Sequence, residues 1–243
     1  MKLFRRLRKR IQSILLPRVY ALGKRVSCPC CGWQGWKFLP AGVNNASNRL
    51  CPKCGSLERF RMLLSYLGTK TEVLSNPINL LEIAPVECLG SYLQALETVN
   101  YVSSDLNSSK AMVWSDLTKM GFADGLFDLI ICIHVLEHIP DDRSAFMELK
   151  RMLSPAGFGL LMVPIRGNKT LEIPDAKPKD YEKLYGQHDH VRFYGLDIVQ
   201  RMVAAGLRVE VLDMFQVFDH LSCEKYGLYG DDQYIFKFSK DEK

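Results

Sequence analysis

Short apolar runs alternate with segments of helical spacing from residue 78 to the end of the chain. Seven runs have the length and the Ile, Leu, Val and aromatic content of strands. They are INLLEIA (78–84), YVSSDL (101–106), AMVWSD (111–116), FDLIICIHV (127–135), FGLLMVPI (158–165), RVEVLDM (208–214) and QYIFKFS (233–239). The fourth run is almost continuously apolar, as expected of a central parallel strand that is covered on both faces.

Helices are predicted between these strands where apolar residues recur every three or four positions. The spacing runs from Leu89 to Leu96, from Phe146 to Leu153 and from Leu196 to Val203. A turn is expected at residues 155–157, and Gly206 is expected to end the third helix. The alternation predicts an α/β fold, a Rossmann-like open and mostly parallel sheet with helices on both faces.

Five of the eight cysteines lie between residues 28 and 54, in the patterns CPCCG and CPKCG. Cys28 with Cys31, and Cys51 with Cys54, form two Cys-x-x-Cys pairs, each followed by glycine. Two such turns supply four thiolates, which predicts a closed, structural Zn(II) site in a small zinc ribbon. Cys30 is a spare member that could replace one ligand. A disulfide pair and a redox dithiol are the alternatives.

The other cysteines and the aromatic residues of the ribbon are expected to pack. Trp33, Trp36 and Phe38 lie between the two pairs and are predicted to form the core of the ribbon. A single cysteine is usually a small buried hydrophobe, so burial is expected for the remaining three. These are Cys88, Cys132 and Cys223.

The N-terminus differs from the rest of the chain in charge. The chain has a net charge of +5, yet its first 25 residues carry no Asp or Glu and many Lys and Arg, so the remainder is mildly acidic. An apolar stripe from Leu3 to Ile14 predicts a basic amphipathic helix over residues 1–25. Contact of residues 1–16 with an anionic membrane surface and docking on the protein itself are open alternatives. A transit peptide and nucleic-acid binding are two others.

Polar side chains follow four successive predicted strands, at Glu82, Asp105, Asp116 and His134. In an open α/β sheet, a ligand binds beyond the carboxyl ends of the strands, where the strand order reverses. The spacing from Glu82 to Asp105 is close to the roughly 20 residues between a nucleotide loop and its ribose-binding acid. The four positions together therefore predict a nucleoside site, although each one alone could be a helix cap or a loop residue.

Residues 80–165 resemble class I S-adenosylmethionine-dependent methyltransferases of the type 11-like group. The similarity is most specific in WSDLTKMGFADGLFDLIICIHVLEHIPDDRSAFMELKRMLSPAGFGLLMVP (114–164). The two cysteine pairs and GQHDHVRFYG (186–195) are similar to a subgroup that carries a zinc ribbon. The resemblance implies S-adenosylmethionine as cofactor, with these neighbours: Glu82 and Ala84 at the methionine part, Asp105 and Leu106 at the ribose, Asp116 and Leu117 at the adenine, and His134 beside the sulfonium.

The loop after the first predicted strand departs from the pattern of this family. The family usually has glycine at the positions of Ala84, Val86 and Cys88, where a missing side chain lets the backbone approach the cofactor. Pro85 gives up an N–H, but a helix start tolerates this because that donor has no helical partner. S-adenosylmethionine has no pyrophosphate to hold. The altered loop is therefore still expected to bind the cofactor.

Methyl transfer to a hydroxyl group benefits from a general base, and histidine suits this role near neutral pH. His188 and His190 follow the fifth predicted strand and are the predicted catalytic residues, with His190 preferred as the base. Arg192 is expected to hold an anionic group, and Tyr194 to line the pocket. A polar loop without chemistry and a second metal site are the alternatives for the His188-x-His190 pair.

The predicted activity is O- or N-methylation of a small-molecule, saccharide or lipid-linked acceptor. Two alternatives remain: an rRNA or tRNA methyltransferase that grips RNA through the zinc module, and a non-catalytic methyltransferase-like assembly protein. The acidic body makes nucleic acid the less favoured partner. Three segments are predicted: residues 1–25, a ribbon at 26–58 and a methyltransferase domain at 59–243. Without a long apolar run or a signal peptide, the chain is predicted to be cytoplasmic, with or without contact at the membrane surface.

Overall fold

A computed structural model describes residues 20, 22–42 and 45–240. The predicted basic helix at 1–25 and its membrane contact at 1–16 lie almost entirely outside these residues. The chain forms two compact units. The first comprises Met1–Glu72, Glu87–Tyr92 and Phe215–Gly230, and the second comprises Val73–Val86, Leu93–Met214 and Asp231–Lys243. The predicted boundary between residues 58 and 59 stays a prediction.

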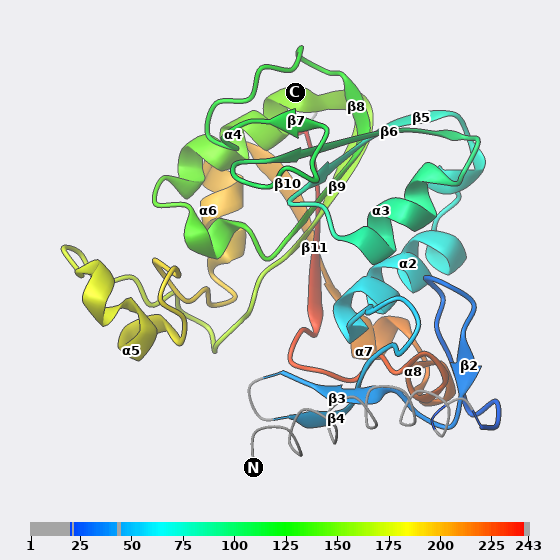
Figure 1. Ribbon diagram of the computed structural model, residues 1–243. Coiled ribbons are helices and arrows are strands. Elements are labelled where there is room, and N and C mark those ends of the chain that lie inside the picture. Colours follow the sequence, from blue (N-terminus) through cyan, green and yellow to red (C-terminus); the bar gives the residue numbers. More distant parts are fainter. Residues whose placement is uncertain (1–19, 21, 43–44, 241–243) are drawn as a thin grey trace. The chain divides into compact units, whose positions relative to one another are not determined.

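The second unit is built on a seven-stranded sheet with the strand order β10-β11-β9-β8-β5-β6-β7 (Figure 1). The strands are β5 (Ile78–Ile83), β6 (Val99–Asp105), β7 (Val113–Trp114), β8 (Phe127–Ile133), β9 (Leu153–Met162), β10 (Leu207–Asp213) and β11 (Tyr234–Lys240). β11 pairs antiparallel with both of its neighbours, while the pairs from β9 across to β7 are parallel. The prediction of a Rossmann-like, mostly parallel sheet is confirmed.

The strand order reverses between β5 and β8. From β5 the chain moves outward to β6 and β7, and it then returns to place β8 on the other side of β5. The register aligns Leu80 with both Tyr101 of β6 and Leu129 of β8, so the three strands end at the same edge of the sheet. This reversal is the position at which open α/β sheets form their ligand crevice.

Helices α4 (Asp142–Met152) and α6 (Ile198–Ala204) lie side by side against this sheet (Figure 1). Asp141 caps α4 by accepting a hydrogen bond from the Ser144 amide. Phe146 and Ile198 from the two helices join one buried core with Ile130 of β8. The predicted end of the third helix is also found, since Gly206 follows α6 with a φ of 81°.

The turn predicted at 155–157 is wrong. α4 ends at Met152, and β9 begins at Leu153, which pairs with Phe127 before the register shifts to pair Phe158 with Leu129. Residues 154–157 are therefore a bulged start of β9. A Cβ on Gly157 would lie 2.9 Å from the carbonyl oxygen of Phe127, so glycine permits this close approach.

Shorter elements complete the chain, and Figure 1 labels the larger ones. They are η1 (Val73–Ser75), α3 (Glu87–Gln94), η2 (Leu136–His138), η3 (Pro178–Asp180), α5 (Tyr181–Tyr185) and α7 (Met214–Val217). None of the helices in the described part of the chain is long and apolar enough to cross a membrane.

The described part of the first unit contains two small hairpins, two complete helices, and most of α3 and α7. The hairpins are β1 (Val26–Ser27) with β2 (Gln34–Gly35) and β3 (Leu39–Ala41) with β4 (Ala46–Leu50), and the complete helices are α2 (Glu58–Lys70) and α8 (His220–Tyr226). The rings of Trp33 and Phe38 pack 5.5 Å apart, but Trp36 is 55% exposed, so its predicted core position is wrong.

A buried arginine connects the parts of the first unit. The Arg61 guanidinium donates hydrogen bonds to the carbonyls of Arg49, Ser56, Tyr226 and Gly227, at 2.6–2.9 Å. It also lies 3.9 Å from the centre of the Phe38 ring. A fully buried cation is tolerated only when its donors are satisfied in this way. Arg61 therefore ties α8 to the segment that carries the second cysteine pair.

Candidate active site and metal centre

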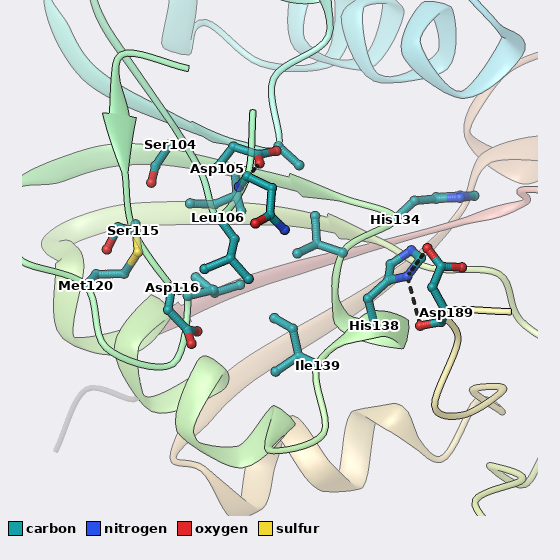
Figure 2. Close-up of a pocket in the computed structure, with 15 residues that line it drawn as sticks. Ser104, Asp105, Leu106, Ser115, Asp116, Met120, His134, His138, Ile139 and Asp189 are labelled. Atoms are coloured by element: carbon teal, nitrogen blue, oxygen red, sulfur yellow. Dashed lines mark hydrogen bonds and ion pairs between the residues drawn. The ribbon is translucent and has the colours of Figure 1, made fainter. Parts of the chain in front are cut away.

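A cavity of about 460 Å³ lies at the carboxyl ends of β5, β6 and β8, beside the reversal in strand order. This volume is in the range of pockets that take ligands of nucleoside size. Six of the seven residues predicted to bind the cofactor line it. They are Ala84, Asp105, Leu106, Asp116, Leu117 and His134. Figure 2 shows Asp116 across the cavity from His138 and Asp189, which also line it.

The two aspartates are held by hydrogen bonds within their own loops. Asp105 Oδ1 accepts hydrogen bonds from the amides of Asn107 and Ser108, each at 2.7 Å. Asp116 Oδ1 accepts two from Thr118, one from the amide and one from the hydroxyl, each at 2.8 Å. Each turn fixes one carboxylate oxygen and leaves the second available to a ligand. The sequence therefore places two oriented anionic acceptors in the same cavity.

The glycine-poor loop keeps a backbone conformation that glycine favours. Ala84 has a φ of 54°, and its amide donates to the Ser104 carbonyl at 2.8 Å. This left-handed conformation costs a residue with a Cβ about 1–2 kcal/mol. His134 is the second residue of the cavity lining with a φ of 54°. Strained residues of this kind concentrate at functional sites, where the surrounding structure holds them in place.

Glu82 is buried beneath the loop and does not line the cavity. Its carboxylate accepts hydrogen bonds from the Tyr101 hydroxyl at 2.6 Å and from the Val86 amide at 3.0 Å. Burial raises the pKa of Glu82 to about 7, against the opposing effect of these two hydrogen bonds. Glu82 thus supports the loop from Ala84 to Val86.

We expect Glu82→Gln to change how stability depends on pH. Because the pKa of Glu82 is raised on folding, its stabilising contribution is present below its unfolded value near 4.5 and is lost as pH rises through about 7. The free energy of unfolding of the Gln variant should therefore gain about 3 kcal/mol relative to wild type between pH 4.5 and pH 8. Urea unfolding across this range measures the difference, with the exposed Glu97→Gln as control. A difference that stays constant with pH would contradict the assignment.

Of His138, His188 and His190, only His138 lines the cavity. Its Nδ1 lies 3.2 Å from both the backbone oxygen and a carboxylate oxygen of Asp189 (Figure 2). His190 is buried behind it, with the two rings 4.6 Å apart and nearly perpendicular. His188 is exposed, and neither His188 nor His190 lines the cavity. Burial, with His138 as a further cause, lowers the pKa of His190.

The predicted roles of Arg192 and Tyr194 are wrong. Neither residue lines the cavity, and both are fully buried. Arg192 donates hydrogen bonds to the carbonyls of Leu136 and Pro140, and the Tyr194 hydroxyl donates to Asp142 at 2.7 Å. Arg192 therefore shapes the loop that follows β8, because its guanidinium occupies the carbonyls that this loop leaves unpaired.

Two acidic residues near the cavity were not singled out from the sequence. Asp232 Oδ1 lies 2.9 Å from His134 Nε2, although the two residues are 98 positions apart. Glu137 lies next to His138 in η2, where its carboxylate is buried. Glu137 could have been noticed as the polar residue that follows the apolar run at 127–135, whereas nothing local in the sequence connects Asp232 with His134.

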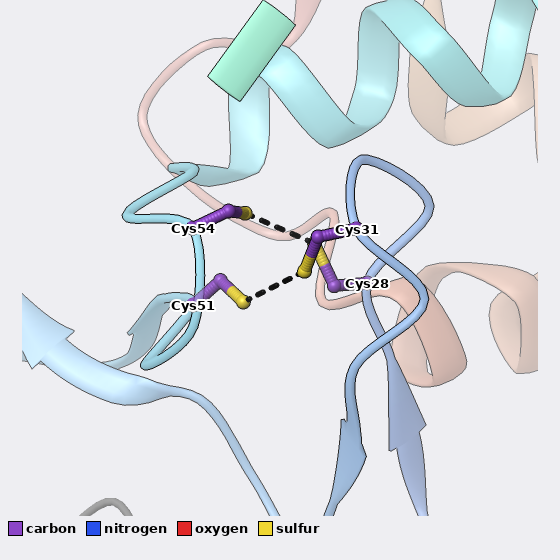
Figure 3. A group of neighbouring side chains, drawn as sticks. All are labelled: Cys28, Cys31, Cys51 and Cys54. Carbon is purple, nitrogen blue, oxygen red and sulfur yellow. Dashed lines mark hydrogen bonds between the residues drawn. The ribbon is translucent and has the colours of Figure 1, made fainter. Parts of the chain in front are cut away.

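The four predicted cysteine ligands form a single cluster in the first unit. Figure 3 shows Cys28 and Cys31 facing Cys51 and Cys54, and the four sulfurs lie within 4.8 Å of one another. The Cys28–Cys54 and Cys31–Cys51 sulfur pairs are each 3.7 Å apart. A tetrahedral Zn(II) ion with sulfur at about 2.3 Å sets its ligands about 3.8 Å apart. The donor set and its spacing therefore fit zinc.

Backbone turns position these thiols. The amide of Gly32 donates to the Cys28 carbonyl, and the amide of Gly55 donates to the Cys51 carbonyl, with φ near 70° at both glycines. Hydrogen bonds from neighbouring thiols, first that of Cys28, hold the pKa of Cys54 well below its usual range. Cys30 is buried nearby and outside the group of four. Cys88, Cys132 and Cys223 are buried, as predicted.

Comparison with known proteins agrees with this architecture. Residues 92–161 match the family model of the methyltransferase domain. Among solved structures, the chain is similar to an S-adenosylmethionine-dependent methyltransferase from Mesorhizobium loti, with 15% identity, a TM-score of 0.50, and coverage of 73% of this chain and 97% of the other. No match was found among curated proteins.

Two further structural neighbours differ from each other in activity. One is a proposed sarcosine dimethylglycine methyltransferase from Galdieria sulphuraria, with 12% identity, a TM-score of 0.55, and coverage of 79% of this chain and 88% of the other. The other is the [4+2]-cyclase SpnF, with 12% identity, a TM-score of 0.53, and coverage of 96% of both chains. These likenesses concern the fold, which does not by itself fix the reaction.

The seven-stranded sheet and the methyltransferase-domain match at residues 92–161 point to the same fold. The chain has the fold of class I S-adenosylmethionine-dependent methyltransferases, and its residues 92–161 match the methyltransferase-domain model, as the sequence resemblance predicted. S-adenosylmethionine is the cofactor expected for this fold.

Proposed function

We propose that the enzyme methylates oxygen or nitrogen of a small-molecule, saccharide or lipid-linked acceptor. The composition of the cavity supports this proposal, because its lining includes Asp105, Asp116 and Asp189 and no Lys or Arg among the described residues. RNA binding depends on basic side chains that neutralise phosphates. An acidic cavity of this size therefore suits a small acceptor better than a polynucleotide.

The cofactor would lie between the two oriented aspartates and the loop at Ala84. Asp105 with Leu106 would hold the ribose, and Asp116 with Leu117 would contact the adenine. Ala84 would approach the methionine part, supported from below by Glu82, with His134 near the sulfonium. S-adenosylmethionine, when bound, supplies the methyl group and its own leaving group.

The acceptor would bind on the side of the cavity that His138 and Asp189 form. There the protein has to orient the nucleophile and take up or dissipate its proton. His190, the predicted base, packs against the His138 ring and would influence the acceptor through it. His188 lies exposed outside the cavity lining, which makes its predicted role the weaker of the two.

We also propose that Cys28, Cys31, Cys51 and Cys54 bind one structural Zn(II) ion. Four protein ligands fill a tetrahedral site, so no position remains for a substrate. The ion would then stabilise the first unit and take no part in methyl transfer.

Calorimetric titration with S-adenosylmethionine and S-adenosylhomocysteine tests cofactor binding, and we expect micromolar dissociation constants. A screen of metabolite extracts with methyl-labelled donor should then transfer label to a small product. Filter binding of RNA at low and moderate salt is the control. Strong RNA binding with a steep salt dependence, or label in RNA, would overturn the acceptor class, and the absence of cofactor binding at millimolar concentration would overturn the proposed function.

A further inference from the structure

Glu137, His138 and His190 bring one carboxylate and two imidazoles together at the edge of the cavity. One ligand atom from each residue lies within 4.8 Å of the others. A divalent ion that binds nitrogen and oxygen at about 2.0–2.2 Å sets its ligand atoms about 3–4 Å apart. Small side-chain rotations would therefore close the cluster around an ion. We propose that these three residues form a second metal site, for a divalent transition-metal ion such as Zn(II).

Two members of this cluster carry buried polar atoms that have no hydrogen-bond partner among the described residues. Both carboxylate oxygens of Glu137 and the Nδ1 atom of His190 lack a hydrogen-bond partner among the described residues, although Glu137 Oε1 lies 3.7 Å from His134 Nδ1. Glu137 is 1% exposed and His190 is 3% exposed. Buried polar atoms nearly always have a hydrogen-bond partner, and a buried carboxylate that accepts no hydrogen bond is costly. A bound cation would satisfy both residues at once.

The surrounding contacts hold the ligands in place. The Asp189 contacts at His138 Nδ1 orient that ring and leave its Nε2 for an ion, an arrangement common around metal-binding histidines. The Val191 amide donates to the Glu137 carbonyl at 2.9 Å, which fixes the segment bearing His190 against η2. The cluster is therefore built from two segments far apart in the sequence that are bound to each other.

The position of His138 connects this site with the proposed function, on which its catalytic role rests. Two histidines and one glutamate are a ligand set of catalytic zinc sites that keep an open fourth position. Because His138 lines the cavity, this position would face the acceptor. A metal-bound acceptor hydroxyl would release its proton to solvent more readily. Its oxygen would then form the bond to the methyl carbon, while the electron pair of the breaking carbon–sulfur bond stays on sulfur.

Cobalt(II) titration of the metal-free full-length chain tests this proposal, because thiolate-bound cobalt has strong charge-transfer absorption that nitrogen- and oxygen-bound cobalt lacks. We expect two equivalents in wild type, one of each spectral kind. Glu137→Gln and His190→Asn should lose the second kind and keep the thiolate site. His138→Asn should also lose the second kind. Because the His138 ring is 33% exposed, this substitution should disturb folding least of the three. His188→Asn, which replaces the exposed neighbour, should keep both equivalents.

A single cobalt equivalent in wild type would overturn the second site, as would a second equivalent that survives all three ligand substitutions. Titration with S-adenosylhomocysteine on the same samples separates this result from the proposed function. Absent cofactor binding in a wild type that takes two equivalents would count against the proposed function and leave the metal site standing. Normal cofactor binding in a wild type that takes only one cobalt equivalent would count against the second metal site and leave the proposed function standing.

Discussion

Replacing Cys51 with serine is expected to remove the metal ion from the first unit and to unfold that unit. Structural zinc sites contribute about 10–16 kcal/mol of apparent binding free energy in small domains, which are commonly unfolded without the ion. The two hairpins of this unit are only two to five residues long per strand, too short to be stable alone. Elemental analysis should show the loss of one zinc per chain, and hydrogen exchange should show lost protection within residues 26–70.

Cys30→Ser is the matched control for this substitution. Cys30 lies in the other cysteine turn, between Cys28 and Cys31, and is also buried, but it is outside the group of four sulfurs that face one another. This variant should keep its zinc and its exchange protection. If Cys30→Ser lost the metal while Cys51→Ser kept it, the ligand assignment would be wrong and Cys30 would be a ligand.

Asp105→Ala is expected to weaken binding of S-adenosylhomocysteine by about 100-fold. A hydrogen bond to a charged group contributes about 1.5–3 kcal/mol, and 2.7 kcal/mol corresponds to about a 100-fold change in the dissociation constant. The carboxylate already has one oxygen held by the Asn107 and Ser108 amides, so it needs no rearrangement to accept from a ligand. Calorimetric titration of each variant measures the effect.

Two further variants separate lost contact from lost loop structure. Asp105→Asn keeps an oxygen for the two backbone amides but loses the charge, so we expect a smaller loss, of about 10-fold. Asp124→Ala removes a carboxylate that is 78% exposed and pairs with Arg151 outside the cavity, and it should bind normally. Equal affinities for Asp105→Ala and wild type would exclude Asp105 from the cofactor site.

Hydrophobic patterning was sufficient for most of the fold because it reports local burial. The run at 127–135 predicted β8, since a strand covered on both faces has to be apolar throughout. The start of β9 was missed because the Pro155–Gly157 segment has turn residues but lies in a bulge between Leu153 and Phe158, which both pair with β8. Pairing with a strand elsewhere in the chain overrides such local signals.

The sequence likewise predicted some residues of the candidate site correctly and misplaced others. Cys-x-x-Cys spacing identified the four cysteines that cluster, because two thiols in one turn carry their chemistry within four residues. Asp105 and Asp116 were identifiable because strand ends meet at one edge of a parallel sheet. Glu82, by contrast, proved to lie beneath its loop, since alternate strand residues point to opposite faces and only the three-dimensional packing shows which face is lined by the cavity.

The sequence by itself determined the class of fold, the cysteine cluster and the acidic strand ends, because each depends on spacing along a few neighbouring residues. Only the tertiary structure decided which histidine faces the cavity and which carboxylates accompany it. His138 meets Asp189 and His190 across 51 or more positions, and His134 meets Asp232 across 98. Such meetings depend on how the loops after β8 and β9 and the segment before β11 pack, which no local pattern of residues encodes.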